Sequence, residues 1–260
     1  MKKNILILSF GLLFITSCSE DNDDNISSNN NINTTFNFTH NWDGTNVSNT
    51  DFNVIQYTNE NGEQLSIERL RYLISDITFT KENGETIIID AYNLVDVTAN
   101  ENMSFSPSIP IPTGVYSNVS FTFGFDNEDN IDGAYTDLNS ASWNVPMMLG
   151  GGYHYMQLEG KFIDNTTTET GYAYHAIRAA DISDPNEILF QDTFFDVNLG
   201  EITITNDITF EIRMNISEWF KNPNQWDLNI LHSTLMPNFD AQVMMHDNGQ
   251  SVFSLGTINQ

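Results

Sequence analysis

The sequence predicts an all-β fold, an antiparallel β-sandwich with short peripheral helices near the C-terminus. Many short segments alternate apolar or aromatic with polar residues, as in 34–40 (TTFNFTH) and 119–125 (VSFTFGF). This period of two is typical of strands with one buried face. Glycine, proline and asparagine turn signals separate the segments, and many short strands joined by such turns favour a sandwich.

The predicted strands follow one another along the chain. The first, 34–40, places Phe36, Phe38 and His40 on one face. Asn83 and Gly84 form a hairpin signal, because both residues accept the positive φ angles of a tight turn. This turn joins strands 69–80 and 86–95. Further strands are predicted at 119–125, 153–163, 171–178, 194–199, 208–214 and 251–255, and short helices at 216–221 and 239–246.

The N-terminus predicts export and a lipid anchor. Residues 1–17 begin with two lysines and continue as an apolar run that is too short to span a bilayer and is typical of a signal peptide. Ile15, Thr16, Ser17 and Cys18 resemble a bacterial lipobox. That resemblance implies cleavage before Cys18 and acylation of this residue, which is the only cysteine in the chain. An ordinary secretory signal with a chance cysteine is the alternative.

The residues after Cys18 separate the predicted anchor from the domain. The acidic run 19–24 resembles the surface-export signal of Bacteroidetes lipoproteins, and a solvated tether is the alternative reading. Residues 18–33 are thus predicted to be an acidic, asparagine-rich tether, and residues 34–260 a single domain. The predicted location is the outer membrane, with the domain exposed at the cell surface or facing the periplasm.

Charge and motifs exclude several functions. The formal net charge is −26, so no basic footprint is available for nucleic acid or for direct adhesion to an anionic membrane. The sequence contains no G-x-S-x-G motif and no phosphate-binding glycine loop. Gly150, Gly151 and Gly152 precede a predicted strand and not a helix, which argues against a dinucleotide site. We therefore expect that the protein is not an enzyme.

Three of the five histidines are candidate metal ligands. His40 and His154 are predicted to point into the sandwich near strand ends, His154 on the face of Met156, and His175 lies on the next predicted strand. Imidazoles gathered at the end of a sandwich suit a soft or borderline metal. The alternative is that each histidine is a core or rim residue bonded to a backbone carbonyl.

Two further features have both a metal-binding and an ordinary reading. The acidic segment 126–133 (DNEDNIDG) offers oxygen ligands for a structural calcium ion, although it is not an EF-hand, and a solvated turn is the alternative. Thioether ligands for Cu(I) come from Met147, Met148 and Met156, with two more near the C-terminus; methionine is also a common core filler.

Several segments together resemble the MbnP-like family of bacterial periplasmic and surface proteins. The most specific is 152–160 (GYHYMQLEG), which precedes the Tyr174–His175 pair. Weaker segments are 71–75 (RYLIS), 121–126 (FTFGFD), Asn130 with Gly133 and Ala134, and 248–253 (NGQSVF). The resemblance extends from about residue 35 to the C-terminus.

The family resemblance implies a copper-binding lipoprotein without enzymatic activity. Family members resemble proteins that bind Cu(I) through histidines and an oxidised tryptophan, kynurenine, which a di-haem cytochrome of the peroxidase type produces. This sequence departs from that pattern, because Phe38 occupies the position two residues before His40 where related copper sites have tryptophan. Trp42 and Trp143 are then the candidates for oxidation. A metal-free surface module for glycan or protein, using tyrosines expected to be exposed, is the alternative function.

Overall fold

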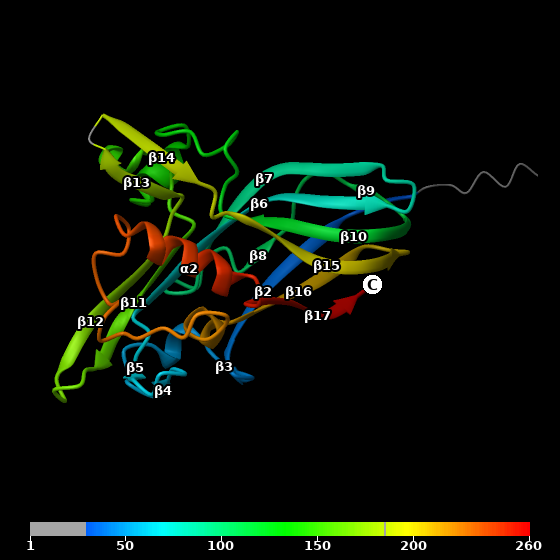
Figure 1. The fold of residues 1–260 in the computed structure, drawn as a ribbon. Coiled ribbons are helices and arrows are strands. Elements are labelled where there is room, and N and C mark those ends of the chain that lie inside the picture. Colours follow the sequence, from blue (N-terminus) through cyan, green and yellow to red (C-terminus); the bar gives the residue numbers. More distant parts are fainter. Residues whose placement is uncertain (1–29, 185) are drawn as a thin grey trace, which may run out of the picture.

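The structure, a computed structural model, describes residues 30–184 and 186–260 and consists mainly of two packed β-sheets (Figure 1). The predicted signal peptide, Cys18 and all but the last residues of the predicted tether lie outside the described residues. Within the described part, no helix is long and apolar enough to cross a membrane. The prediction of an all-β sandwich with few short helices is confirmed.

The larger sheet is built around the long strand β6 (Arg69–Lys81). The first part of β6 pairs with β11 (Met156–Ile163), and its later part pairs on the same side with β10 (Gly114–Phe123). The remaining strands of this sheet are β7 (Thr86–Asp96) on the other edge of β6, β12 (Glu169–Ala176) and β5 (Gln64–Leu65) on β11, β4 (Tyr57–Thr58) on β5, and β15 (Phe195–Ile204) on β10. The N-terminal half of β6 therefore places its side chains beside those of β11 and β12.

The smaller sheet pairs the beginning of the described chain with its end. Its order is β17 (Phe253–Asn259), β16 (Ile208–Asn215), β2 (Thr34–Trp42) and β3 (Thr45–Asn46), with β8 (Ser104–Phe105) also on β2. The β2–β16 pair is parallel, whereas the other pairs that the structure describes are antiparallel. Parallel neighbours need a long connection, and here nearly the whole larger sheet lies between the two strands in sequence.

Aromatic side chains from both sheets fill the space between them. Phe36 of β2 stacks on Phe210 of β16 with ring centroids 4.9 Å apart, and Phe210 meets Phe79 of β6 edge to face. Phe253 of β17 contacts Phe121 of β10 in the same manner. Such pairs add to the free energy of burying large apolar surfaces, so the core is one continuous layer that joins the sheets.

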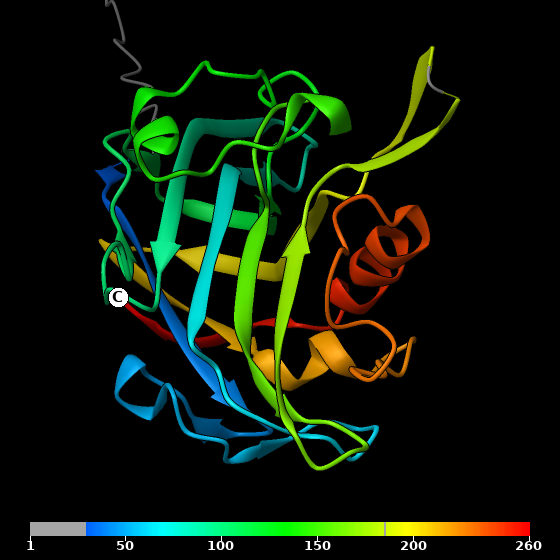
Figure 2. The ribbon, with the colours of Figure 1, turned by 90° about the vertical axis from the view of Figure 1, so that its left-hand side faces the viewer.

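The peripheral elements partly match the predictions. The two predicted helices exist as η3 (Ile216–Phe220), a 3-10 helix, and α2 (Phe239–Gly249), whose N-terminus is capped by the side chain of Asn238. Elements that the sequence did not predict are α1 (Thr136–Ser140), the 3-10 turns η1 (Asn49–Asp51) and η2 (Met147–Leu149), the pair β1 (Asn31–Ile32) with β9 (Ile111–Pro112), and the hairpin of β13 (Ala179–Asp184) with β14 (Glu187–Gln191). This last hairpin projects from the body beside α2 (Figures 1 and 2).

Candidate metal centre

A loop between β10 and β11 covers part of the outer face of the larger sheet, where Arg71 donates to the Ala141 carbonyl and Tyr92 donates to Asp137. Within it, residues 143–154 fold back on themselves, which we call the Trp143–His154 loop. The His154 amide donates to the Trp143 carbonyl at 2.9 Å, and the Val145 amide donates to the Gly152 carbonyl at 2.9 Å. Trp143 and His154 therefore face each other at the base of the loop, and η2 forms its tip.

Glycines allow this loop to turn. Gly150, Gly151 and Gly152 all have positive φ, at 95°, 69° and 81°, a region that other residues enter at a cost. A Cβ on Gly152 would also lie 2.4 Å from Oδ1 of Asn130, the atom that accepts the Tyr153 amide. The triple glycine is thus a packing requirement in the segment that leads through His154 into β11.

His154 has one ring nitrogen in a hydrogen bond and one without a partner. Its Nδ1 lies 2.8 Å from the Trp143 carbonyl oxygen. Its Nε2 is buried and has no hydrogen-bond partner among the described residues. Burial lowers the pKa of His154 to about 4, so the imidazole is neutral at pH 7. Because the carbonyl can only accept, Nδ1 carries the proton and Nε2 presents a lone pair.

His175 lies against His154. The two ring centroids are 5.3 Å apart in an edge-to-face arrangement. His175 is the register partner of Gln157 on β11, and its Nε2 lies 2.8 Å from Oε1 of Glu159. The hydrogen bond from His175 is the main cause that lowers the pKa of Glu159. Because the Glu159 carboxylate can only accept, Nε2 of His175 donates to it, and Nδ1 is the ring nitrogen that this contact leaves available.

The prediction that His154 continues the face of Met156 into the sandwich was wrong. β11 begins only at Met156, and the chain bends before it. Alternation therefore does not extend to residue 154, and the side chain meets His175 on the face of Gln157. The bend brings together two of the three predicted ligands.

Trp143 and Arg71 complete this cluster. The Trp143 ring is fully buried and lies 5.6 Å from the His154 ring, and the Arg71 guanidinium lies over Trp143 at 5.0 Å. Arg71 also donates to Gln157 and to the Ala141 carbonyl. Of the seven buried side-chain polar atoms without partners in the described chain, three belong to His154, Trp143 and Arg71. Such atoms normally find partners; those of Trp143 and Arg71 are N–H donors, so Nε2 of His154 is the one of the three that can offer a lone pair to a metal.

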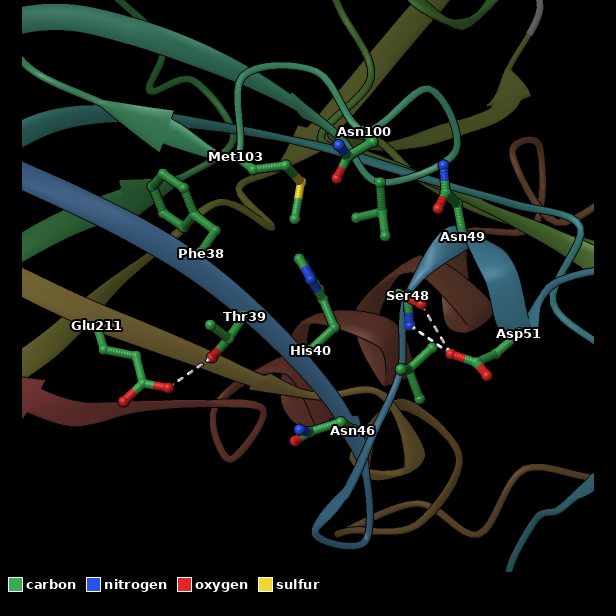
Figure 3. A pocket seen from close by; sticks show the side chains of 12 residues that line it. Phe38, Thr39, His40, Asn46, Ser48, Asn49, Asp51, Asn100, Met103 and Glu211 are labelled. Atoms are coloured by element: carbon green, nitrogen blue, oxygen red, sulfur yellow. Dashed lines mark hydrogen bonds between the residues drawn. The ribbon is translucent and has the colours of Figure 1, made fainter.

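His40 lies elsewhere, between the sheets. Its side chain points from β2 into a cavity of about 320 Å³, and Met103 and Phe38 also line this cavity (Figure 3). Its Nε2 lies 3.0 Å from the Tyr72 hydroxyl, and burial lowers the pKa of His40 to about 3. The predicted orientation of His40 toward the interior is confirmed. Met103, a loop residue just before β8, was not identified from the sequence.

The other tryptophan candidate, Trp42, packs its ring against Tyr57 and Phe220, away from the outer histidine pair. Trp42 ends β2 and stacks on Tyr57 with centroids 4.9 Å apart. Among the methionines, Met156 is a core residue, whereas Met147 and Met148 are exposed at the tip of the Trp143–His154 loop. Met156 therefore has a packing role, whereas Met147 and Met148 are accessible to solvent.

The acidic segment 126–133 contributes one residue to a carboxylate cluster. Oxygen atoms of Asp129, Asp76 and Asp90 lie within 4.8 Å of one another. Two other carboxylates of the segment bind backbone amides, Asp126 those of Glu128 and Asp129 and Asp132 that of Gly152. Burial and the neighbouring carboxylates raise the pKa of Asp76 to about 6. The cluster therefore takes Asp129 from the acidic segment, Asp76 from β6 and Asp90 from β7.

Comparisons with known proteins agree with the architecture. The profile of the MbnP family matches residues 31–243. A solved structure, MbnP from Methylosinus trichosporium, superposes with a TM-score of 0.52 at 12% sequence identity, covering 87% of this chain and 99% of the other. At this identity the likeness shows a shared fold. No curated protein matches the sequence.

Proposed function

The chain belongs to the MbnP family, and we propose that it is a copper-binding lipoprotein without enzymatic activity, which holds Cu(I) between His154 and His175. The single observation that carries this proposal is the buried Nε2 of His154, which has no partner among the described residues and belongs to a ring that packs edge to face against a second imidazole. Neutral imidazoles are good ligands for copper.

The surroundings of both imidazoles favour metal binding over two core histidines. Each ring has one nitrogen bound to an oxygen acceptor, the Trp143 carbonyl for His154 and the Glu159 carboxylate for His175. Such outer partners commonly set the tautomer and orientation of metal-binding histidines. A core histidine satisfied by the backbone would not be expected to keep a buried ring nitrogen without a partner.

The cavity of His40 is a second candidate copper position. His40 and Met103 supply a neutral imidazole and a thioether to one cavity, and both donors suit Cu(I). Tyr72 would hold the other ring nitrogen in place. Phe38 lines the same cavity, so a tryptophan-derived ligand is absent from that position.

Trp143 is the tryptophan that we propose for oxidation by a di-haem cytochrome partner. Its ring is 5.6 Å from the His154 ring, and its Nε1 has no partner among the described residues. Trp42 instead stacks on Tyr57. Mass spectrometry of protein from the native host tests this step, because oxidation of Trp143 changes the mass of its peptide, and an unmodified Trp143 contradicts it.

The anchor and location complete the proposal. We place the protein on the outer membrane through acyl chains on Cys18, with the domain at the cell surface or facing the periplasm, and without a nucleic-acid partner. Each buried methylene contributes about 0.8 kcal/mol to anchoring. Incorporation of labelled palmitate that disappears in Cys18→Ser tests the lipid attachment.

The alternative, a metal-free surface module for glycan or protein, loses its tyrosine-based motivation in the structure. None of the nine tyrosines is exposed; Tyr92 and Tyr135 are half-buried and the others are buried. The expectation of exposed tyrosines was therefore wrong, because these rings fill the core and the covered outer face.

Titration with Cu(I) against a chelator of known affinity tests the two copper positions. We expect His154→Ala with His175→Ala to weaken binding by about 100-fold or more, since removal of ligands costs several kcal/mol. His40→Ala is expected to leave this affinity unchanged, and His246→Ala, on α2, is the matched control. If only His40→Ala weakens binding, the inner cavity is the copper position. If no variant does, the protein does not bind copper through these histidines.

A further inference from the structure

The end of the molecule that carries the β13–β14 hairpin has an exposed apolar surface. Five of the eleven exposed large apolar residues in the described chain come from three neighbouring segments there. We call this surface the Met–Phe patch, and it consists of Ile131, Met147, Met148, Ile182 and Phe190. Scattered apolar residues are ordinary on protein surfaces, but a continuous group marks an interaction site.

Contacts between the segments show that the patch is continuous. The Phe190 ring lies over Gly150, where an added Cβ would come within 2.3 Å of it. The Met147 sulfur and the Asp132 side chain both lie against Gly151. The loop at 131–132, the tip of the Trp143–His154 loop and β14 therefore meet in one surface.

Phe190 is held in this position and is not a mobile side chain of a free hairpin. The Arg178 guanidinium lies 3.8 Å from the centre of its ring, and Arg178 also donates to Oδ1 of Asn127 at 3.0 Å. Asn127 in turn donates to Asp192. The exposed apolar side chains thus stand on a preorganised base, which lowers the entropy lost on binding.

The segments that form the patch carry mainly negative charge. Between Lys81 and Lys161 the sequence has no lysine or arginine, and between Lys161 and Arg213 it has only Arg178, which is engaged with Phe190 and Asn127. Asp132 lies against Gly151 and Asp192 accepts from Asn127, and further exposed carboxylates on the same segments are Glu128, Asp184 and Glu187. A second copy of the chain would bring the same negative rim, and like charges at a rim disfavour association.

We propose that the Met–Phe patch is a docking surface for a basic protein whose contact area has an apolar centre ringed by lysine and arginine side chains. An apolar centre with a charged rim is the usual anatomy of a protein interface. The acidic rim would increase the association rate of such a partner and would make binding sensitive to salt. The patch includes the tip of the loop that holds His154 at its base, but docking does not require bound copper.

Site-specific photo-crosslinking in cells of the native host, with the full-length protein, tests this surface. A benzophenone amino acid replaces Met148, which is 73% exposed. The matched control carries it at Ile230, also 73% exposed, beside Asn229, which bonds Glu63 near β5. We expect a protein adduct from position 148 but not from position 230, with the crosslinked peptide of the partner rich in lysine and arginine.

Charge reversal provides the second part of the test. Glu128→Lys with Glu187→Lys changes two exposed carboxylates, and we expect the adduct yield to fall at least fivefold, as it should when salt is raised to about 0.5 M. Circular dichroism melting of the variants confirms that the fold is retained. The His154→Ala, His175→Ala double variant should still form the adduct at position 148, because docking does not require bound copper. Loss of the adduct in this variant would contradict that independence.

Four outcomes overturn the docking surface, and the first three concern the adduct itself. They are equal adducts at positions 148 and 230, an adduct that is a second copy of this chain or a lipid, and an adduct insensitive both to charge reversal and to salt. Absence of any adduct at position 148 also overturns it. Each of these results leaves the copper titration unaffected, so failure of one proposal is distinguishable from failure of the other.

Discussion

The two histidine regions of this protein are built in different ways. His40 stands on β2, where every second side chain from Thr34 to Trp42 is buried. His154 stands at the base of a loop that depends on three consecutive positive-φ glycines and on backbone contacts between residues far apart in the turn. The first region is a product of strand alternation, and the second is a product of loop packing.

This difference shows how neutral histidines arise by two routes. In both regions burial is the main cause of the lowered pKa. His40 is buried by the sandwich itself, beside Tyr72. His154 is buried by Trp143 and its own loop. Changes in the loop should therefore disturb the His154 region and leave the His40 region intact.

The largest effect is expected from Gly152→Ala, which tests the dependence of the outer pair on the loop. The new Cβ would enter a positive-φ position and lie 2.4 Å from Oδ1 of Asn130. Strain and overpacking together should lower the free energy of unfolding by about 3 kcal/mol. Urea unfolding measures the loss, and Cu(I) titration should show weaker binding in the same variant.

Gly133→Ala is the matched control for this change. Gly133 also has positive φ, at 73°, but a Cβ there would meet no atom within 4 Å. Gly133→Ala should lower the free energy of unfolding by about 1 kcal/mol and leave the affinity for Cu(I) unchanged. Equal losses in both variants would mean that φ alone matters and that the contact with Asn130 does not position the loop.

His40→Leu tests whether the inner region is sensitive to acid. The folded-state pKa of His40 is about 3, below its ordinary 6.5, so the unfolded chain binds an additional proton between these values. The wild type should therefore lose about 3 kcal/mol from this group as the pH falls from 7 to 4. The variant should lack that loss. Any difference by which its free energy of unfolding falls below that of the wild type at pH 7 should therefore be smaller at pH 4. A pH-independent difference in unfolding free energy would contradict this assignment.

Asp76→Asn should change the free energy of unfolding by a smaller amount, and the pH dependence should have the opposite sign to that of His40. Burial, with the charges of Asp129, Asp126 and Asp90, raises the pKa of Asp76 to about 6. The folded state thus binds the extra proton here, and the wild type gains stability from this group as the pH falls through 6. Because the side chain is only half-buried, a gain of about 1 kcal/mol is expected for Asp76→Asn at pH 7.

The gain from Asp76→Asn should disappear below pH 4, where the wild-type carboxyl is neutral in both states. Asp76 has a φ of 49°, which asparagine also accepts, so a gain that persists at low pH would come from the backbone instead of the charge. Thermal unfolding across pH 4–8 distinguishes these outcomes. Added Ca²⁺ should stabilise the wild type more than the variant if the carboxylate cluster with Asp129 and Asp90 binds it.

The fold and the candidate site were predictable to different degrees. The alternation of Phe36, Phe38 and His40 predicts the inner face correctly, because the period-two rule holds along an uninterrupted strand. The same rule fails for His154, because the strand begins two residues later. Met103 carries no local pattern that would link it to His40, since only the packing of the segment before β8 against β2 brings them together.

The sequence by itself determined the alternating strands, the acidic surface and the family, because these depend on local periodicity, composition and motif. It also determined which imidazoles were available. Only the tertiary structure decided that His154 and His175 share a site while His40 faces a separate cavity, and that three loops combine into one apolar patch. Those relations depend on long-range packing, in which a single bend before β11 reverses the direction of a side chain, and no pattern of neighbouring residues encodes them.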